Sequence, residues 1–298
     1  MVFKAAKKAG AKTVHTLHNY RPWCISGLLY IDNKGECERC INKTIPLSSI
    51  MYKCYRRSFV QTVLAQLAFI FYKLRGMFKA IDKYLVLTDF QRKKTIEFGL
   101  DPENVLLKPN LIGLENINIS NISKKEKNGY IFVGRIDISK GIKTLLDVWA
   151  QLPEEYKLTV VGTGHEYESF ISLYKCDNII FKGACSRDLT LYLISSSRYL
   201  IQPSLLYETF GLTIVEAMAF GTPVIGYKIG TRNDLVQDSI TGFLTEPRDL
   251  KQTIIKSHQF KDYDVLSENA RRFSENFYDN IIINKQVDYY SDIIQSKN

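Results

Sequence analysis

Two glutamates eight positions apart, in the second half of the chain, have a setting suited to binding hydroxyl groups. Glu208 lies in a loop after a predicted strand, and Glu216 lies one turn inside the helix that follows. A carboxylate accepts hydrogen bonds from hydroxyls, and Glu216 could accept two at once from the diol of a ribose. The amides of Phe210, Gly211 and Leu212 begin this helix without partners inside it, so they can bind a phosphate or sugar oxygen. Taken alone, the two glutamates could equally be ordinary surface acids.

A second group of candidate residues is positively charged. A predicted strand ends at Gly134, Arg135 follows it, and Lys140 precedes a helix that begins near Gly141. An arginine and a lysine at the carboxyl edge of a parallel sheet could hold a pyrophosphate and neutralise the charge of a leaving group. In isolation, residues of this kind are more often solvated bases in a loop.

A Gly-x-Gly pair, Gly162 and Gly164, follows another predicted strand. By itself this pattern is weak evidence for phosphate binding. It indicates a tight turn whose backbone closely approaches another group, which could be a ligand or simply a neighbouring helix.

Four cysteines lie close together near the start of the chain, and they could form a structural zinc site. They are Cys24, Cys37, Cys40 and Cys54, with a Cys-x-x-Cys pair at the centre. Thiolates are suitable zinc ligands in a reducing compartment, although one such pair is a weaker signal than two. The alternative is four free thiols in a loop.

These residues need a scaffold that brings the ends of several strands together. Between residues 130 and 245, short apolar runs alternate with segments that have helical spacing. Strands that alternate with helices form βαβ units, and strands that are apolar throughout are typical of a parallel sheet covered on both faces. Six such strands make one complete doubly wound domain. The predicted strands span residues 130–134, 158–162, 178–183, 199–203, 223–227 and 242–245.

The first 110 residues contain fewer strands. We predict strands at residues 13–17, 84–88 and 105–108, and one helix at 58–78. Three strands are too few for a second full domain of the same type. The chain also opens on a lysine-rich, helix-like segment with no strand before it. We therefore expect a Rossmann-like N-terminal domain that is incomplete at its start.

The predicted elements divide the chain into domains. Residues 117–129 are rich in Asn, Ser and Lys and have little periodicity, as is typical of a polar connector. We expect a partial N-terminal domain at residues 1–116, a C-terminal domain at 130–275 and a helix at 276–298 that returns toward the first domain.

At this point the motifs resemble a known family. The pattern Gly134-Arg135…Lys140-Gly141, Gly162-x-Gly164, Glu208-x7-Glu216 and Gly221-x-Pro223-Val-Ile is similar, in order and spacing, to the nucleotide-sugar domain of retaining glycosyltransferases of the glycogen-synthase-like group (family 4). This similarity covers roughly residues 130–250. The segment Leu17-His18-Asn19-Tyr-Arg21-x-x-Cys24…Cys37-x-x-Cys40 resembles the end of the N-terminal domain in bacterial polysaccharide-synthesis members.

The resemblance implies an α/β fold with two Rossmann-like domains (GT-B type), the N-terminal one incomplete, and an active site in the cleft between them. The implied donor is a nucleotide-diphosphate sugar. Members of the family retain anomeric configuration without a metal or other catalytic cofactor, with the donor phosphate as the base. Because the start of the N-terminal domain has no counterpart here, the chain could come from a truncated gene product, an alternative start or one half of a split enzyme.

The resemblance also implies a role for each motif residue. Arg135 and Lys140 would bind the diphosphate and stabilise the departing charge. Glu208, with the amides of residues Phe210 to Thr213, would hold the sugar hydroxyls and the phosphate, and Glu216 would take the ribose hydroxyls. The glycines Gly134, Gly162 and Gly164 would line the donor. His18 matches the histidine that touches the transferred sugar; His15 competes for that role but could simply be buried in its strand.

Charge is unevenly distributed. The whole chain has 40 basic residues (Lys and Arg) and 31 acidic residues (Asp and Glu), a net charge of +9. Residues 1–110 have 19 basic and 8 acidic residues, a net charge of +11. The rest of the chain has 21 basic and 23 acidic residues, a net charge of −2. This excess favours an anionic partner: a membrane surface, a nucleic acid or a phosphorylated substrate. A solvated basic face without a partner is the alternative. No basic-aromatic reading motif is present, so we do not expect nucleic-acid binding.

The segment 56–75 has bases at both ends and an apolar middle. It could lie in the interface of an anionic membrane, which suits an enzyme with a lipid-linked acceptor. The alternative, which we favour slightly, is a helix packed on the domain sheet.

Together these features favour a glycosyltransferase of cell-surface polysaccharide synthesis, such as capsule or lipopolysaccharide. Its acceptor would be a saccharide or a polyprenyl-linked saccharide. The alternative is a non-catalytic nucleotide-sugar-binding subunit, or half-enzyme, that needs a partner chain. No apolar run reaches the ~18 residues of a membrane span, and the N-terminus lacks a secretory signal. We expect a cytoplasmic protein, peripheral at the inner face of the membrane.

Overall fold

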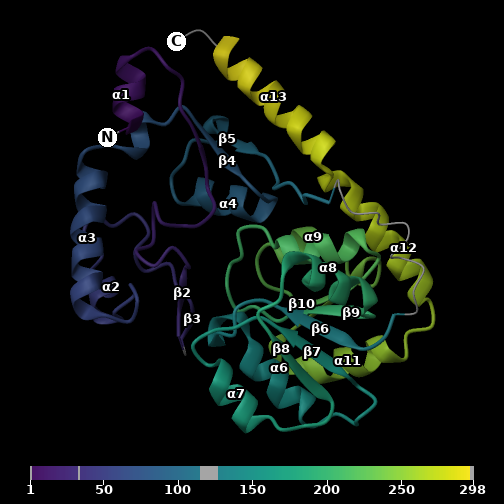
Figure 1. Cartoon of the computed structure of the whole chain (residues 1–298). Coiled ribbons are helices and arrows are strands. Elements are labelled where there is room, and N and C mark those ends of the chain that lie inside the picture. Colours follow the sequence, from purple (N-terminus) through teal and green to yellow (C-terminus); the bar gives the residue numbers. More distant parts are fainter. Residues whose placement is uncertain (1, 33, 115–126, 296–298) are drawn as a thin grey trace. The chain divides into compact units, whose positions relative to one another are not determined.

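The computed structural model describes residues 2–32, 34–114 and 127–295. The chain forms two compact units (Figure 1). Unit 1 comprises Met1–Asn110 and Ile282–Asn298, and unit 2 comprises Leu111–Ile281. Both are built on parallel sheets, which confirms the expected α/β class. Most of the connector expected at 117–129 lies outside the described residues, and unit 2 begins earlier and ends later than the expected C-terminal domain.

Unit 2 contains a six-stranded parallel sheet in the order β11-β10-β9-β6-β7-β8. This is the doubly wound order in which the first and fourth strands of the unit lie side by side. All six predicted strands are confirmed, each within a few residues of the expected bounds. They are β6 (Tyr130–Val133), β7 (Leu158–Val161), β8 (Ile179–Gly183), β9 (Tyr199–Gln202), β10 (Val224–Tyr227) and β11 (Gly242–Thr245).

Helices cover both faces of this sheet (Figure 1), as continuously apolar strands require. One face carries α8 (Arg187–Ser196), α9 (Leu212–Ala219) and α12 (Tyr263–Ser274), and the other carries α6 (Ile142–Trp149), α7 (Tyr167–Leu173) and α11 (Leu250–His258). Shorter elements complete the unit: η3 (Ile138–Lys140), α10 (Arg232–Leu235), η4 (Pro247–Asp249) and η5 (Glu275–Phe277).

The apolar spacing of α6 explains how that helix docks. Ile142, Leu145, Leu146 and Trp149 fall on one helical face, and all four are fully buried. The Trp149 indole donates a hydrogen bond to the carbonyl of Tyr156 at 2.7 Å, so its polar atom is satisfied inside the core. Burial of each of these side chains stabilises the folded unit by about 1.5–3 kcal/mol.

Unit 1 has a three-stranded parallel sheet in the order β1-β4-β5. These strands confirm the three that the sequence predicts. Unit 1 also contains a small antiparallel hairpin, β2-β3, that the sequence pattern did not reveal. The strands of unit 1 are β1 (Val14–Thr16), β2 (Tyr30–Ile31), β3 (Gly35–Glu36), β4 (Lys83–Val86) and β5 (Val105–Leu107).

The helices of unit 1 lie before, between and after these strands. They are α1 (Val2–Lys8), α2 (Leu47–Met51), α3 (Phe59–Leu74), η1 (Phe78–Ala80), α4 (Asp89–Glu97), η2 (Pro102–Asn104) and α13 (Asp279–Gln295). From Ile282 on, α13 belongs to unit 1, where the hydroxyl of Tyr289 donates to the carbonyl of Leu107 at 3.0 Å. No helix within the described ranges is both long enough and apolar enough to cross a membrane.

Helix α3 differs from the favoured expectation. It begins after Ser58, whose side chain accepts a hydrogen bond from Gln61, and it ends near Gly76. It packs against α2, and two of its three buried residues, Thr62 and Gln66, are polar. Most large apolar residues of α3 are exposed, so the helix is buried less than a helix packed on the sheet would be, and its packing on the sheet stays a prediction.

Candidate functional site

The site in unit 2 lies where the strand order of its sheet reverses. β6 and β9 are neighbours, but the connections that follow them run in opposite directions. In a doubly wound sheet, the loops at the carboxyl ends of such a strand pair leave a crevice that binds ligands. The loop after β6 holds Gly134, Arg135 and Lys140, and the loop after β9 holds Glu208. The topology therefore brings two separate sequence motifs to one edge of the sheet.

An ion pair joins these two loops. The Lys140 ammonium lies 2.6 Å from Oε1 of Glu208, and the Ser204 hydroxyl donates to the same oxygen at 2.7 Å. Burial by itself would raise the pKa of Glu208, but Lys140, Ser204 and the nearby Arg232 together hold that pKa below its ordinary value. Glu208 is therefore ionised at neutral pH and is held in a fixed position beside a cation.

Two residues that the sequence reasoning missed support the Glu208 loop. The fully buried guanidinium of Arg232 donates to the carbonyls of Tyr227, Ser204 and Leu206 at 2.9, 2.6 and 3.3 Å. These bonds tie the end of β10 to the loop after β9. The hydroxyl of Thr231, also fully buried, donates to the carbonyl of Glu208. No motif in the sequence signals this role, because it depends on backbone carbonyls that only the fold brings together.

Arg135 lies in the same loop as Lys140 but is exposed. No carboxylate lies within ion-pair distance of it in residues 2–32, 34–114 and 127–295. Its guanidinium thus has room to accept an anion at the edge of the sheet.

The start of α9 presents a row of open amides. Gly211 precedes the helix with φ 108° and ψ 58°, a left-handed conformation that favours glycine. Across the described part of the chain, the amides of Phe210, Gly211, Leu212 and Thr213 have no protein acceptor. Since a helix N-terminus carries partial positive charge, this is a site for an anionic or hydroxyl oxygen.

Glu216 is buried inside α9 and is paired with Arg187. The two side chains meet at 2.9 Å, and the Arg187 guanidinium also donates to the carbonyl of Ile112 at 2.9 Å. Burial raises the pKa of Glu216 above its ordinary value, although Arg187 partly offsets this effect. A ligand diol that bonds to Glu216 would therefore have to share its carboxylate with Arg187.

The Gly162-x-Gly164 turn packs against the loop after β6. A Cβ on Gly162 would lie 1.9 Å from the carbonyl oxygen of Gly134, and one on Gly164 would lie 2.0 Å from that of Ile136. The turn thus approaches a neighbouring loop rather than a helix. Contact between these glycines and a substrate stays a prediction.

His15 lies within β1 of unit 1, and His18 follows that strand by two residues. His18 is exposed, whereas His15 is half-buried, with its ring between those of Phe3 and Tyr84 at 5.6 and 6.3 Å. Burial, and to a smaller degree the nearby His18, lowers the pKa of His15. His15 therefore has the surroundings of a packed strand residue, whereas His18 is exposed.

The four clustered cysteines are free thiols that come close enough to influence one another. Burial raises the pKa of Cys54 to about 12, and Cys24, Cys40 and Cys37 add to that effect. Burial also raises the pKa of Cys40. As they lie, no three His, Cys, Asp or Glu side chains in the described ranges are arranged to hold a metal ion. Zinc binding by this cluster stays a proposal.

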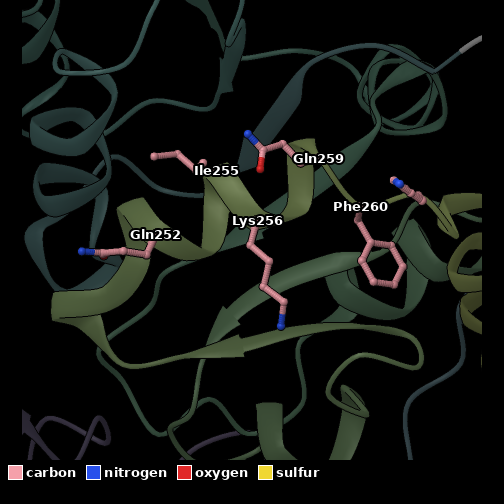
Figure 2. A pocket seen from close by; sticks show the side chains of 6 residues that line it. Gln252, Ile255, Lys256, Gln259 and Phe260 are labelled. Atoms are coloured by element: carbon pink, nitrogen blue, oxygen red, sulfur yellow. The ribbon is translucent and has the colours of Figure 1, made fainter.

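A shallow cavity of about 460 Å³ lies on α11 and is lined by side chains between Gln252 and Lys261 (Figure 2). None of the predicted site residues lines this cavity. Phe260 packs on Phe243 with ring centroids 5.3 Å apart, and the Lys256 ammonium lies 5.3 Å from the same ring. These contacts explain the hollow as part of the packing between α11 and β11, and we assign it no ligand.

The fold and the site together define a Rossmann-type unit that presents cations, open helix amides and carboxylates at its switch point. The chain belongs to the family described as glycosyl transferases group 1, whose model matches residues 115–279. Over 98% of its length it is similar in fold to the Anabaena protein Alr3699/HepE, solved in complex with UDP and glucose, with a TM-score of 0.67, 18% identity and 74% of that chain covered. The expected GT-B type fold is confirmed.

Two curated relatives are similar in sequence. One is a 41.2 kDa protein in the cps region of Klebsiella pneumoniae, 26% identical over 72% of this chain and 63% of its own length. The other is the O-antigen chain mannosyltransferase C of Escherichia coli, 28% identical over 57% of this chain and 48% of its own length. The chain thus spans less than two thirds of the length of these relatives.

Proposed function

We propose that this chain is a hexosyltransferase that moves a sugar from a nucleotide-diphosphate sugar to a saccharide or polyprenyl-linked saccharide, with retention of anomeric configuration. The observation that carries this proposal is the Lys140–Glu208 pair at the switch point, beside Arg135 and the open amides of α9. Cations and helix amides suit a diphosphate, and fixed carboxylates suit sugar and ribose hydroxyls. The capsule-region and O-antigen relatives support a role in cell-surface polysaccharide synthesis.

In this proposal, the bond from the anomeric carbon to the donor β-phosphate oxygen breaks, and a bond to an acceptor hydroxyl oxygen forms. The acceptor proton passes to a diphosphate oxygen, and the nucleoside diphosphate leaves. Arg135 and Lys140 stabilise the charge that develops on it. Glu208 and the amides from Phe210 to Thr213 position the transferred sugar and the phosphate.

Other groups hold the two ends of the donor. Glu216 accepts hydrogen bonds from the ribose hydroxyls, and His18 contacts the transferred sugar. The chemistry needs no catalytic cofactor in this scheme, and any zinc at the four cysteines would be structural. We also propose that the protein is cytoplasmic and peripheral at the inner face of the membrane. The net charge of +11 on residues 1–110, from 19 bases and 8 acids, supports its association with an anionic membrane surface.

Calorimetric titration with UDP, GDP and their common sugar conjugates tests the proposal. We expect one nucleotide to bind and Glu216→Ala to weaken it about 30-fold, because hydrogen bonds to a charged group contribute about 2 kcal/mol. Glu154→Ala, at an exposed loop position of the same unit, is the matched control and should leave the affinity unchanged. Equal effects of the two substitutions, or no binding of any nucleotide, would contradict the proposal. Nucleotide binding without transfer to any acceptor would favour the half-enzyme that needs a partner chain.

A further inference from the structure

Helix α3 buries two polar residues, Thr62 and Gln66, and one large apolar residue, Phe69. Thr62 and Gln66 are buried and hydrogen-bonded: the Ser49 hydroxyl donates to Oε1 of Gln66 at 2.7 Å, and the Tyr55 amide donates to Oγ1 of Thr62 at 3.0 Å. A helix docked on an apolar core buries apolar residues instead. Hydrogen bonds therefore contribute to the docking of α3 beside the buried Phe69, and most of its large apolar residues are left exposed.

The outward side of α3 carries a continuous apolar stripe. Val60, Leu64, Leu67, Phe71 and Leu74 are 65, 61, 60, 41 and 73% exposed. Their spacing alternates between four and three residues, so all five lie along one face of the helix. We call these five residues the α3 stripe. Five large apolar side chains in one exposed row mark a binding surface rather than an ordinary helix face.

Bases stand at both ends of the stripe. Arg56 precedes α3 and Arg75 follows it, with guanidinium groups 5.6 Å from the ring of Tyr55 and 5.0 Å from that of Phe71. Neither has a carboxylate within ion-pair distance in the part of the chain that the structure describes. An apolar surface flanked by uncompensated bases complements an apolar molecule or layer that carries negative charge.

A cavity of about 640 Å³ opens beside the stripe, and it has two chemically different walls. Leu64, Phe69 and Tyr72 of α3 form an apolar wall, and Leu64 also belongs to the stripe. His15 and Arg21, from β1 and the loop after it, form the polar wall. The cavity is thus suited to a molecule with one apolar part and one polar part.

Arg21 supplies the charge of the polar wall. Its guanidinium lies 5.5 Å from the centre of the Tyr55 ring, and no carboxylate of residues 2–32, 34–114 and 127–295 pairs with it. An unpaired guanidinium held over an aromatic ring is well placed to bind a phosphate with two hydrogen bonds. His18 lies close enough to His15 to lower its pKa, so the polar wall adjoins the histidine assigned to the transferred sugar.

We propose that this cavity and the α3 stripe bind the acceptor, and that the acceptor is an amphiphile with a phosphate-linked isoprenoid or similar long apolar chain. Arg21 holds the phosphate in the cavity, and the apolar chain lies along the α3 stripe. The proposal rests on the proposed function, because it names the acceptor class for the same reaction. A bare anionic bilayer surface and a second copy of this chain are the competing occupants of the stripe.

Vesicle flotation of the full chain tests the proposal. The probes are phosphatidylcholine vesicles alone, with phosphatidylglycerol, and with the same charge fraction of undecaprenyl phosphate. We expect the chain to bind the undecaprenyl phosphate vesicles at least tenfold more tightly than either of the others. Arg21→Ala should reduce that binding about fivefold, whereas Arg21→Lys should keep part of it. Leu67→Gln should reduce binding to all vesicles, and Leu173→Gln, at an exposed apolar position of α7 that is 67% exposed, should not.

Two results would overturn the proposal. Equal binding to phosphatidylglycerol and undecaprenyl phosphate, with no effect of Arg21→Ala, would mean that the surface recognises only anionic membranes. A dimer that Leu67→Gln dissociates, without loss of lipid binding, would mean that the stripe pairs two copies of the chain. Thermal unfolding of each variant identifies any that fail to fold. Nucleotide titration of the wild-type chain is a separate readout, so failure of the donor proposal is distinguishable from failure of this one.

Discussion

The Lys140–Glu208 ion pair gives a prediction that can be worked out from its geometry. The two charged atoms are 2.6 Å apart, and the side chains are only 20% and 16% exposed. Removing one partner of a buried pair costs about 3–5 kcal/mol, because the remaining charge is left buried without compensation. Since part of each side chain still contacts water, we expect Lys140→Met to lower the free energy of unfolding by about 2–3 kcal/mol.

A double-mutant cycle separates the pair from other effects of the substitution. Glu208→Gln removes the charge that Lys140→Met leaves behind, so the double variant should lose about 1–2 kcal/mol less than the sum of the two single losses. The assay is urea unfolding followed by the fluorescence of Trp149, which is buried in unit 2. Trp23→Phe, made in all four proteins, removes the other tryptophan, which lies in unit 1.

The pH dependence of this effect has a definite sign. The pKa of Glu208 in the folded chain lies below its ordinary value of 4.5, so its contribution to stability is present above pH 4.5 and is lost as the pH falls through the folded pKa. The difference between wild type and Lys140→Met should therefore shrink at low pH. A loss below about 0.5 kcal/mol at neutral pH, or strict additivity in the cycle, would refute the reasoning.

Three further predictions concern other contacts. Arg187→Ala removes the cation that offsets the effect of burial on Glu216, so the pKa of Glu216 should rise further. As the pH is lowered, nucleotide binding should therefore weaken at a higher pH than in wild type. Nucleotide titrations across a pH series check this, and an unchanged midpoint of the pH dependence would argue against it. Gly164→Ala places a Cβ 2.0 Å from the carbonyl of Ile136 and should cost about 3 kcal/mol or more in urea unfolding; a loss near zero would contradict the close contact. If the four cysteines hold zinc, elemental analysis should find about one zinc per chain, and a chelator should lower the melting temperature of wild type but not of Cys54→Ser; a metal-free chain would exclude the site.

The sheet of unit 2 could be predicted from sequence because its signals are local. Each strand is a short, apolar run next to turn residues, and the helix from Leu212 to Ala219 begins directly after Gly211, where the sequence analysis expected its start. The β2-β3 hairpin could not be predicted, since its strands of two residues each are too short for any alternating pattern to appear.

The site was only partly predictable, for a physical reason. Sequence placed Lys140 and Glu208 in loops after strands, and the parallel topology did bring those loops together. It gave no sign of Arg232 or Arg187, because their roles depend on distant carbonyls and a buried carboxylate. It also overestimated how much of α3 is buried. Apolar composition shows which side chains would gain free energy by burial, but not whether the fold provides a surface that covers them.

The interlocked glycines limit how this protein can change during evolution. A Cβ would lie 1.8 Å from the carbonyl oxygen of Pro203 if added to Gly141, and 1.9 Å from that of Gly134 if added to Gly162. Three loops at the carboxyl edge of the sheet are therefore in backbone contact, and a side chain at either glycine would push two of these loops apart. Under the proposed function, donor preference therefore depends on the side chains that project from these loops rather than on a change in the path of the backbone.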